Sequence, residues 1–213
     1  MSSLRITEIF YSLQGESNTV GIPTVFIRLT GCPLRCGYCD TAYAFTGGEK
    51  KELNDIIAEV ESYGTRYVTV TGGEPLAQTA CLELMTRLLD LGYIVSLETS
   101  GAIDISTVDP RVTKVMDLKT PSSGEMNRNL YENIQHLSKA DQVKFVIGND
   151  EDYRWAKQML LEYQLSDRCE VLFSPVADQQ NLTELANKIL EDRLPVRFQI
   201  QLHKLLWDDA RGK

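Results

Sequence analysis

The sequence lacks a long apolar run and is poor in basic residues, and each shortage argues against a class of binding partner. No uninterrupted hydrophobic stretch approaches the roughly 20 residues that cross a bilayer, so we expect no membrane association. Lys and Arg number 22 against 30 Asp and Glu, which gives a formal net charge of −8. Because a nucleic-acid surface needs many cations to neutralise phosphates, this balance predicts a small-molecule partner and no nucleic acid.

Cysteine and histidine are also scarce. The chain has five cysteines and two histidines in 213 residues. Its first residues, Met1 to Arg5, contain no apolar segment and no small-residue cleavage site. Three of the cysteines are clustered, unlike the paired framework of a secreted disulfide protein, so we expect a reducing, cytoplasmic environment. The length predicts a single domain over residues 1–213.

The clustered cysteines lie in loop 31–41, directly after an apolar segment expected to be a strand. Cys32, Cys36 and Cys39 have the spacing Cys-x3-Cys-x2-Cys. Thiolates select iron–sulfur clusters, zinc or copper(I). Three thiolates can hold three irons of a 4Fe–4S cube and leave the fourth iron open for another ligand, which is our prediction here. Two alternatives are a redox dithiol formed by Cys36 and Cys39, and a zinc site completed by a histidine.

Strand and helix patterns alternate along most of the chain. Strands are expected at 5–12, 25–30, 67–71, 93–98, 112–118, 142–147, 170–173 and near 196–202, and helices at 52–63, 78–91, 151–164 and 181–191. Such alternation predicts parallel βα units, whose ligands gather at the carboxyl ends of the strands. About six parallel strands with short flanking strands fall short of the eight in a closed barrel. The expected fold is therefore an α/β open partial (β/α) barrel.

The carboxyl ends of several expected strands carry polar or flexible residues. The strand at 67–71 leads into Gly72-Gly73-Glu74-Pro75. The two glycines allow a ligand to approach the backbone closely, and Glu74 can accept a hydrogen bond from an ammonium group. The residues that should meet at the same edge of the sheet are Cys32, Glu98, Ser100, Lys119 and Ser174.

Arg28 is an anomaly in the apolar strand at 25–30. Alternation places it with Phe26 and Thr30 on one face of a strand whose two faces both look buried. A buried guanidinium needs a partner, and one alternative is an internal ion pair with an Asp or Glu. Its position four residues before Cys32 favours a ligand carboxylate, which the guanidinium fork binds in a bidentate manner.

These motifs resemble a known superfamily. The cysteine loop, with Tyr38 just before its last cysteine, is similar to the cluster loop of radical S-adenosylmethionine (SAM) enzymes. Gly72-Gly73-Glu74-Pro75 resembles the segment that holds the amino group of SAM in those enzymes. Narrower features resemble the 7-carboxy-7-deazaguanine synthase family: Leu13-Gln14-Gly15-Glu16, Arg28, Cys39-Asp40-Thr41 and the tail Gln201–Trp207.

The resemblance implies a radical SAM lyase that contracts a ring. In that family, 6-carboxy-5,6,7,8-tetrahydropterin becomes 7-carboxy-7-deazaguanine with loss of ammonia, in 7-deazapurine (queuosine) biosynthesis. The implied fold is a partial barrel of the radical SAM type, and the implied cofactors are a 4Fe–4S cluster, SAM and Mg2+. The implied partners are the pterin substrate, a reductant such as flavodoxin or ferredoxin, and a second copy of the chain in a homodimer.

The resemblance also assigns roles to individual residues. The expected substrate-binding residues are Leu13, Gln14, Gly15, Glu16, Arg28, Thr71 and Glu98, of which Glu16, Arg28 and Glu98 are the predicted catalytic residues. The expected SAM-binding residues are Tyr38, Cys39, Asp40, Gly73, Glu74, Ser100, Lys119 and Ser174. Thr41 is expected to ligate Mg2+, although Asp40 is the more conventional ligand on physical grounds.

Two other functions stay open at this stage. One is a radical SAM activase that makes a glycyl radical on a partner protein, which would not need Arg28. The other is a non-catalytic Cys-rich metal-binding module whose site is closed by a fourth protein ligand. Outside the motifs, Cys81 and Cys169 are expected to be partly buried free thiols, and His203 a structural histidine. No proline follows Pro195, so the C-terminal proline that family members place at the substrate has no counterpart here.

Overall fold

Strands and helices alternate along the chain, as their sequence patterns predict. The computed structural model describes residues 2–177, 181–208 and 210–212. The strands are β1 (Ser3–Leu13), β2 (Pro23–Leu29), β3 (Glu49–Glu52), β4 (Tyr67–Gly72), β5 (Ile94–Thr99), β6 (Thr113–Asp117), β7 (Gln142–Ile147), β8 (Glu170–Pro175) and β9 (Arg197–Phe198). The helices are α1 (Leu53–Ser62), α2 (Ala80–Asp90), α3 (Asp150–Glu162), α4 (Leu165–Arg168), α5 (Leu182–Glu191) and α6 (Leu202–Trp207).

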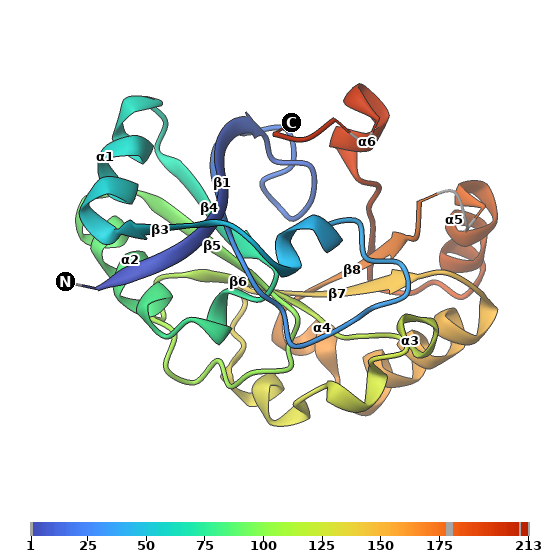
Figure 1. Ribbon diagram of the computed structural model, residues 1–213. Coiled ribbons are helices and arrows are strands. Elements are labelled where there is room, and N and C mark those ends of the chain that lie inside the picture. Colours follow the sequence, from blue (N-terminus) through green and yellow to red (C-terminus); the bar gives the residue numbers. More distant parts are fainter. Residues whose placement is uncertain (1, 178–180, 209, 213) are drawn as a thin grey trace.

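The described strands form one sheet that does not close on itself. Their order is β3-β1-β2-β4-β5-β6-β7-β8-β9, and strands β4 to β8 cross the middle of the molecule in Figure 1. β1 pairs antiparallel with β2 and with β3, and every pairing from β2 to β9 is parallel. Because β3 and β9 lie at the two ends of this order, the expected open partial (β/α) barrel with short flanking strands is confirmed.

Side-chain alternation gives the parallel strands one apolar and one polar face. On β2, Ile27 is buried in the core, whereas Arg28 lies on the opposite face. On β7, Phe145 is buried in the same core, and Lys144 lies on the opposite face. Successive residues of a strand point to opposite sides, so the apolar residues collect under the helices and the polar residues collect on the inner side of the partial barrel.

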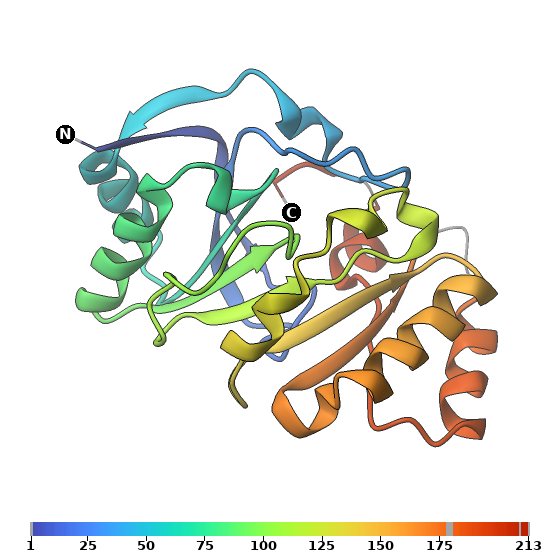
Figure 2. The same cartoon turned by 90° about the horizontal axis from the view of Figure 1, so that it is seen from below.

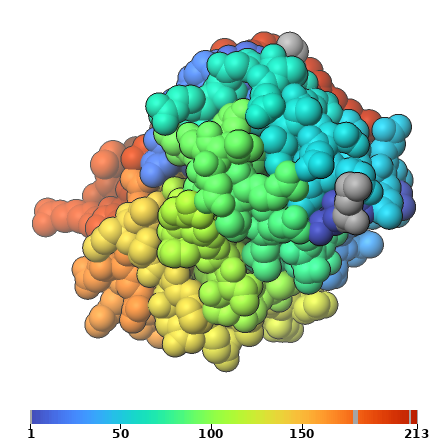
Figure 3. Space-filling model, turned by 90° about the vertical axis from the view of Figure 1, so that its left-hand side faces the viewer, coloured from blue at the N-terminus to red at the C-terminus, as the bar shows by residue number. Residues whose placement is uncertain are grey.

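The helices cover the apolar face of the sheet. α1 and α2 flank the strands of the N-terminal half, and α3 and α5 flank those of the C-terminal half (Figure 2). Residues of α1 and α2, cyan to green, make up much of the surface seen in Figure 3. Four apolar residues of α1 at helical spacing, Leu53, Ile56, Ile57 and Val60, are buried against the sheet. Within the described residues, none of the helices has the length and hydropathy needed to cross a membrane.

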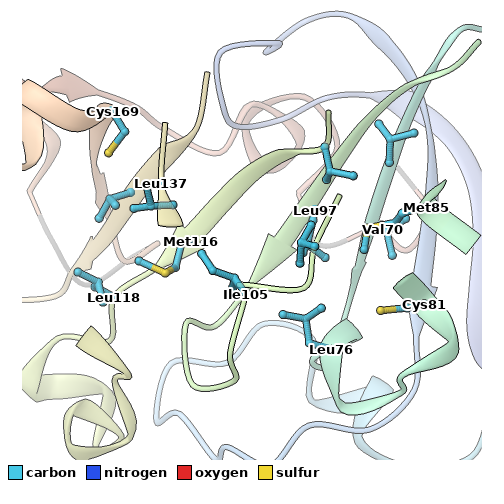
Figure 4. Packing of buried hydrophobic residues seen from close by; sticks show 14 of the residues in the cluster. Val70, Leu76, Cys81, Met85, Leu97, Ile105, Met116, Leu118, Leu137 and Cys169 are labelled. Atoms are coloured by element: carbon cyan, nitrogen blue, oxygen red, sulfur yellow. The ribbon is translucent and has the colours of Figure 1, made fainter. Parts of the chain in front are cut away.

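The apolar core contains both of the isolated cysteines. Val70, Leu97 and Met116, from β4, β5 and β6, lie along the middle of this core, with Cys81 and Cys169 toward its two ends (Figure 4). The predicted free thiols are confirmed, although both are more deeply buried than expected. Burial raises the pKa of Cys81 to about 12 and that of Cys169 to about 11.

Two segments differ from the sequence-based expectation. The strand expected near 196–202 is only the two residues of β9, because Leu202 then begins helix α6 and donates its backbone N–H to the carbonyl oxygen of Gly15. The chain therefore leaves the sheet to cross over the loop that follows β1. The second segment is Glu49–Glu52, for which no strand was expected: it pairs with β1 as strand β3, and the helix expected at 52–63 begins after it, at Leu53. Its charged sequence has low strand propensity, so backbone pairing at the sheet edge determines its conformation.

Candidate active site

A cavity of about 650 Å³ lies at the carboxyl edge of the parallel strands. Its walls come from the strand ends, the loop after β1, the cysteine loop and the C-terminal segment. Most of the residues predicted from the sequence line it: Leu13, Gln14, Gly15, Glu16, Arg28, Cys32, Cys36, Tyr38, Cys39, Asp40, Thr41, Thr71, Gly73, Glu98, Ser100 and Lys119. Glu74 and Ser174 do not line it. Residues from across the first 120 positions thus meet at one edge, as the parallel fold requires.

The cysteine loop is anchored to the sheet by backbone contacts. Gly31 donates its N–H to the carbonyl oxygen of Ala44 at 2.8 Å, and its own carbonyl oxygen accepts from the N–H of Glu74 at 2.8 Å. Gly73 packs so closely on Gly31 that a Cβ there would lie 1.9 Å from the Gly31 carbonyl oxygen. The glycine at position 73 is therefore required for the loop to reach the end of β4.

The three loop cysteines fit an iron–sulfur cube. All three line the cavity and are partly exposed to it. Burial raises the pKa of Cys36 to about 11 and also raises the pKa of Cys32, while the nearby Lys119 ammonium acts in the opposite direction. Among the described residues, no three Cys, His, Asp or Glu side chains converge on a single ion. A cube takes one thiolate per iron, so three thiols that line one cavity match the number it needs when its fourth iron binds another ligand.

Glu74 lies behind the cavity wall, which corrects the expectation that it contacts a ligand directly. The side chain is fully buried. Its carboxylate accepts hydrogen bonds from the Thr99 hydroxyl at 2.9 Å, from the Ser100 N–H at 2.7 Å, and from the Ser100 hydroxyl at 2.6 Å. It also accepts from the N–H of Leu76 at 3.0 Å. With its lone pairs occupied in this way, Glu74 joins the end of β4 to the end of β5.

Arg28 faces the cavity with part of its guanidinium already engaged. Its Nε donates to Glu8 at 2.7 Å, and Nη1 donates to the carbonyl oxygen of Gly72 at 3.3 Å. The Tyr43 hydroxyl also donates to Glu8, at 2.7 Å. Burial lowers the pKa of Arg28, but Tyr43, Glu8 and Glu98 outweigh it and raise the pKa overall. The internal ion pair considered for Arg28 is thus present, and its remaining N–H donors are available for a ligand carboxylate.

Two glutamates on the inner side are held by hydrogen bonds. Glu98 accepts from the Thr71 hydroxyl at 2.8 Å and from the Gln14 side-chain amide at 3.3 Å. Glu16 accepts from the Lys144 ammonium at 2.6 Å and from the Gln201 side-chain amide at 2.7 Å. Each carboxylate can accept further bonds, because ionised carboxylates have about four acceptor directions. These contacts fix the positions of both carboxylates at the cavity.

Oxygen donors also gather beside the cysteine loop. Asp40 is exposed, and its carboxylate accepts from the Gln201 amide at 3.2 Å and lies 3.7 Å from the Lys204 ammonium. The Thr41 hydroxyl lies 3.8 Å from the Cys39 sulfur. Carboxylate and hydroxyl oxygens are the donors that Mg2+ prefers, and both residues line the cavity. The chemistry of these donors therefore fits a magnesium ion.

The C-terminal segment closes one side of the cavity. Leu202 is tied to Gly15 by a backbone hydrogen bond of 3.0 Å. A Cβ on Gly15 would lie 2.5 Å from His203 Nδ1, so this glycine makes room for the histidine. His203 lines the cavity, although the sequence suggested only a structural role. Ser174, expected to contact SAM, is buried, and its hydroxyl donates to the Gln199 carbonyl oxygen at 2.8 Å.

Several cavity residues were not predicted from the sequence. They include Phe10, Tyr43, Asp117, Lys144, Gln201 and His203. Lys144 had a detectable signal, because it interrupts the apolar segment 142–147 at an alternate position, as Arg28 interrupts β2. Gln201 and His203 belong to the tail that carries part of the family resemblance, but no site role was assigned to them, because their contacts depend on a crossing that local sequence does not specify.

Comparison with known proteins places this cavity in a family. Residues 26–160 match the model of the Radical SAM superfamily. The chain is 43% identical over 213 residues to the 7-carboxy-7-deazaguanine synthase of Chlorobaculum tepidum, covering 98% of this chain and 97% of that protein. It is 41% identical over 222 residues to the 7-carboxy-7-deazaguanine synthase of Koribacter versatilis, covering 96% of this chain and 97% of that protein. The crystal structure of QueE from Escherichia coli has the same fold, with a TM-score of 0.78 at 24% identity, covering 94% and 95% of the two chains. The chain therefore belongs to the 7-carboxy-7-deazaguanine synthase family of radical SAM proteins.

Proposed function

We propose that this chain is a 7-carboxy-7-deazaguanine synthase, a radical SAM lyase. Its reaction converts 6-carboxy-5,6,7,8-tetrahydropterin to 7-carboxy-7-deazaguanine with loss of ammonia, in 7-deazapurine (queuosine) biosynthesis. The observation that carries the proposal is one cavity lined by three loop cysteines together with Arg28 and two held glutamates. Identity of 43% to a named synthase over nearly the whole chain supports the same reaction.

Cys32, Cys36 and Cys39 would hold a 4Fe–4S cluster, and its open iron would hold SAM. When bound, the cluster and SAM supply one-electron chemistry that can remove a hydrogen atom from a substrate carbon. Gly73, Ser100 and Lys119 would line SAM, with the segment from Tyr38 to Asp40. Ser174 and Glu74 would act indirectly, by fixing the wall behind these contacts.

The chain's own contribution is placement and exclusion of water. Arg28 would clamp the substrate carboxylate, which determines which ring carbon faces the reacting group. Small errors in such placement cost large factors in rate, because the reacting atoms must approach within roughly 3–3.5 Å. Leu13, Gln14, Gly15 and Thr71 would line the ring, with Glu16 and Glu98 accepting hydrogen bonds from it, and Thr41 would ligate Mg2+.

We infer four further properties from the family. The cluster would be reduced by a flavodoxin or a ferredoxin, because one-electron chemistry needs an external donor. The enzyme would be a homodimer in the cytoplasm. Residues 1–213 would form one radical SAM domain.

The first experiment is an anaerobic assay of the reconstituted, reduced protein. SAM is supplied with and without 6-carboxytetrahydropterin and Mg2+, and 5′-deoxyadenosine and 7-carboxy-7-deazaguanine are measured together. Substrate-dependent formation of both products supports the synthase. 5′-Deoxyadenosine without the deazaguanine would point to another substrate, such as the glycine of a partner protein. If an iron-loaded sample forms neither product, the enzyme is excluded and a metal-binding module is favoured.

A further inference from the structure

Lys144 is a cavity-lining cation that the resemblance does not assign. It lies on β7, and its side chain is only 14% exposed. Its ammonium is 2.6 Å from Glu16 Oε2 and 3.7 Å from Asp117 Oδ2. Burial alone would lower the pKa of Lys144, but Glu16, Asp117 and Glu98 outweigh this and raise the pKa, so the group is charged at neutral pH.

The ammonium retains hydrogen-bonding capacity toward the cavity. A lysine ammonium has three N–H donors. One is taken by Glu16, and the Asp117 oxygen at 3.7 Å is beyond good hydrogen-bond distance. These are its only carboxylate contacts within the described residues. A donor therefore remains beside the Glu16 carboxylate, which itself retains acceptor directions.

The pair presents a donor and an acceptor side by side. A cyclic amide has the complementary arrangement, with a carbonyl oxygen that accepts and an adjacent ring N–H that donates. The proposed substrate carries such a lactam, O4 and N3–H, on its pyrimidinone ring. We propose that Lys144 is a specificity-determining residue that donates to O4 of the pyrimidinone while Glu16 accepts from N3–H. This inference rests on the proposed function.

The strand order supports this orientation. Arg28 lies on β2 and Lys144 on β7, which are four steps apart in the sequence β2-β4-β5-β6-β7 of the sheet. In the substrate, the carboxylate and the pyrimidinone lie at opposite ends of the fused rings. A carboxylate held from β2 therefore directs the lactam toward the β7 side of the cavity.

Glu16 is also fixed on the side away from Lys144. Gln201 donates to its other oxygen, Oε1, at 2.7 Å, and the Glu16 N–H donates to the Gln14 side-chain oxygen at 3.1 Å. A carboxylate held at both oxygens presents a defined edge to a ligand, which is a requirement for discriminating between hydrogen-bonding patterns.

The test compares Lys144→Met with Lys114→Met. Lys114 is a matched control because it is also a buried lysine, paired with Asp141 at 3.1 Å, and it does not line the cavity. Each cluster-loaded protein is assayed with 6-carboxytetrahydropterin and with its 4-thioxo analogue, which keeps N3–H but replaces the accepting oxygen by sulfur. Equilibrium dialysis with pterin-6-carboxylate and with SAM measures binding separately from turnover.

We expect Lys144→Met to raise KM and weaken pterin-6-carboxylate binding by about 10- to 100-fold, with SAM binding unchanged, because a buried acceptor loses its donor. Its preference for the oxo substrate over the thioxo analogue should fall to about twofold or less, whereas the wild type and Lys114→Met keep a preference of about tenfold. If thermal melting shows that Lys144→Met does not fold, Lys144→Ala, which also lacks a donor, replaces it in the same comparison.

Two outcomes overturn the inference. One is an unchanged oxo-to-thioxo preference in the Lys144 variant, and the other is an equal loss for both substrates together with weakened SAM binding, which indicates a structural role alone. The proposed function fails separately, when the wild type forms no deazaguanine from 6-carboxytetrahydropterin.

Discussion

Gly73→Ala should detach the cysteine loop from the end of β4 while leaving the rest of the sheet folded. A Cβ at this position would lie 1.9 Å from the carbonyl oxygen of Gly31, whereas ordinary contact begins at 3.4 Å. The difference, about 1.5 Å, must be absorbed by backbone, since the contacted atoms are not a flexible side chain. Gly31 directly precedes Cys32, so the displacement would pass to the first cluster ligand.

The energetic cost follows from the same contacts. Overpacking costs roughly 1–3 kcal/mol, and disturbing the 2.8 Å hydrogen bond from Glu74 N–H to Gly31 adds about 1 kcal/mol. A total of about 3 kcal/mol would lower Tm by roughly 6–12 °C for a chain of this length. A ligand displaced by more than 1 Å should also reduce cluster occupancy, and a misplaced reacting group can cost about a hundredfold in rate.

The assay is iron and sulfide content after anaerobic reconstitution, together with thermal melting. Gly37→Ala is the matched control, because it lies in the same loop and its Cβ would meet only the Ser122 carbonyl oxygen, at 3.8 Å. We expect the control to bind iron as the wild type does. Equal iron content and Tm in Gly73→Ala and the wild type would refute the steric argument, and so would equal damage in both variants.

Three further predictions concern the clamp, the buried thiols and a helix cap. Arg28→Lys keeps the charge but loses the fork, so KM for the pterin should rise about tenfold or more while SAM binding is unchanged; an unchanged KM would exclude the carboxylate clamp. Cys81 and Cys169 are only 0% and 3% exposed, so a reagent cannot reach their sulfur atoms, whereas the three loop cysteines are partly exposed. Ellman's reagent should therefore label only three thiols in the native apoprotein and five after unfolding, and fast labelling of five in the native state would contradict the burial. The Asn149 side chain accepts hydrogen bonds from two backbone N–H groups at the start of α3. Asn149→Ala should therefore lower the free energy of unfolding, measured by urea denaturation, by about 1 kcal/mol. An unchanged free energy of unfolding would show that the cap is not formed in solution.

Local pattern was enough to predict most of the fold. Helix α1 and the strand at 142–147 follow directly from the periodicity of their apolar residues, because tertiary contacts do not override the local preference of either segment. Strand β3 could not be predicted, because Glu49–Glu52 contains four charged residues and becomes a strand only by pairing with β1. The C-terminal helix α6 depends in the same way on a distant contact, the hydrogen bond of Leu202 to Gly15.

Site residues could be predicted where a chemically distinctive side chain stands at a distinctive place in the sequence pattern. Cysteine spacing and the arginine in an apolar strand identify chemistry directly, and the parallel fold then brings those residues together. The orientation of Glu74 could not be read in this way. Whether a carboxylate at a strand end faces a ligand or the protein depends on donors from a neighbouring strand, here Thr99 and Ser100.

Gly73 and Glu74, which directly follow β4, together connect the cysteine loop, the end of β4 and the cavity wall at β5. Gly73 allows the cysteine loop to pack on the strand end, and the Glu74 N–H secures that loop through Gly31. The Glu74 carboxylate then fixes Ser100, which lines the cavity from β5. A shift of this segment would therefore move the first cluster ligand and the β5 wall at the same time. The cluster and the cavity wall are placed by one piece of backbone, so their relative position is set before any ligand binds.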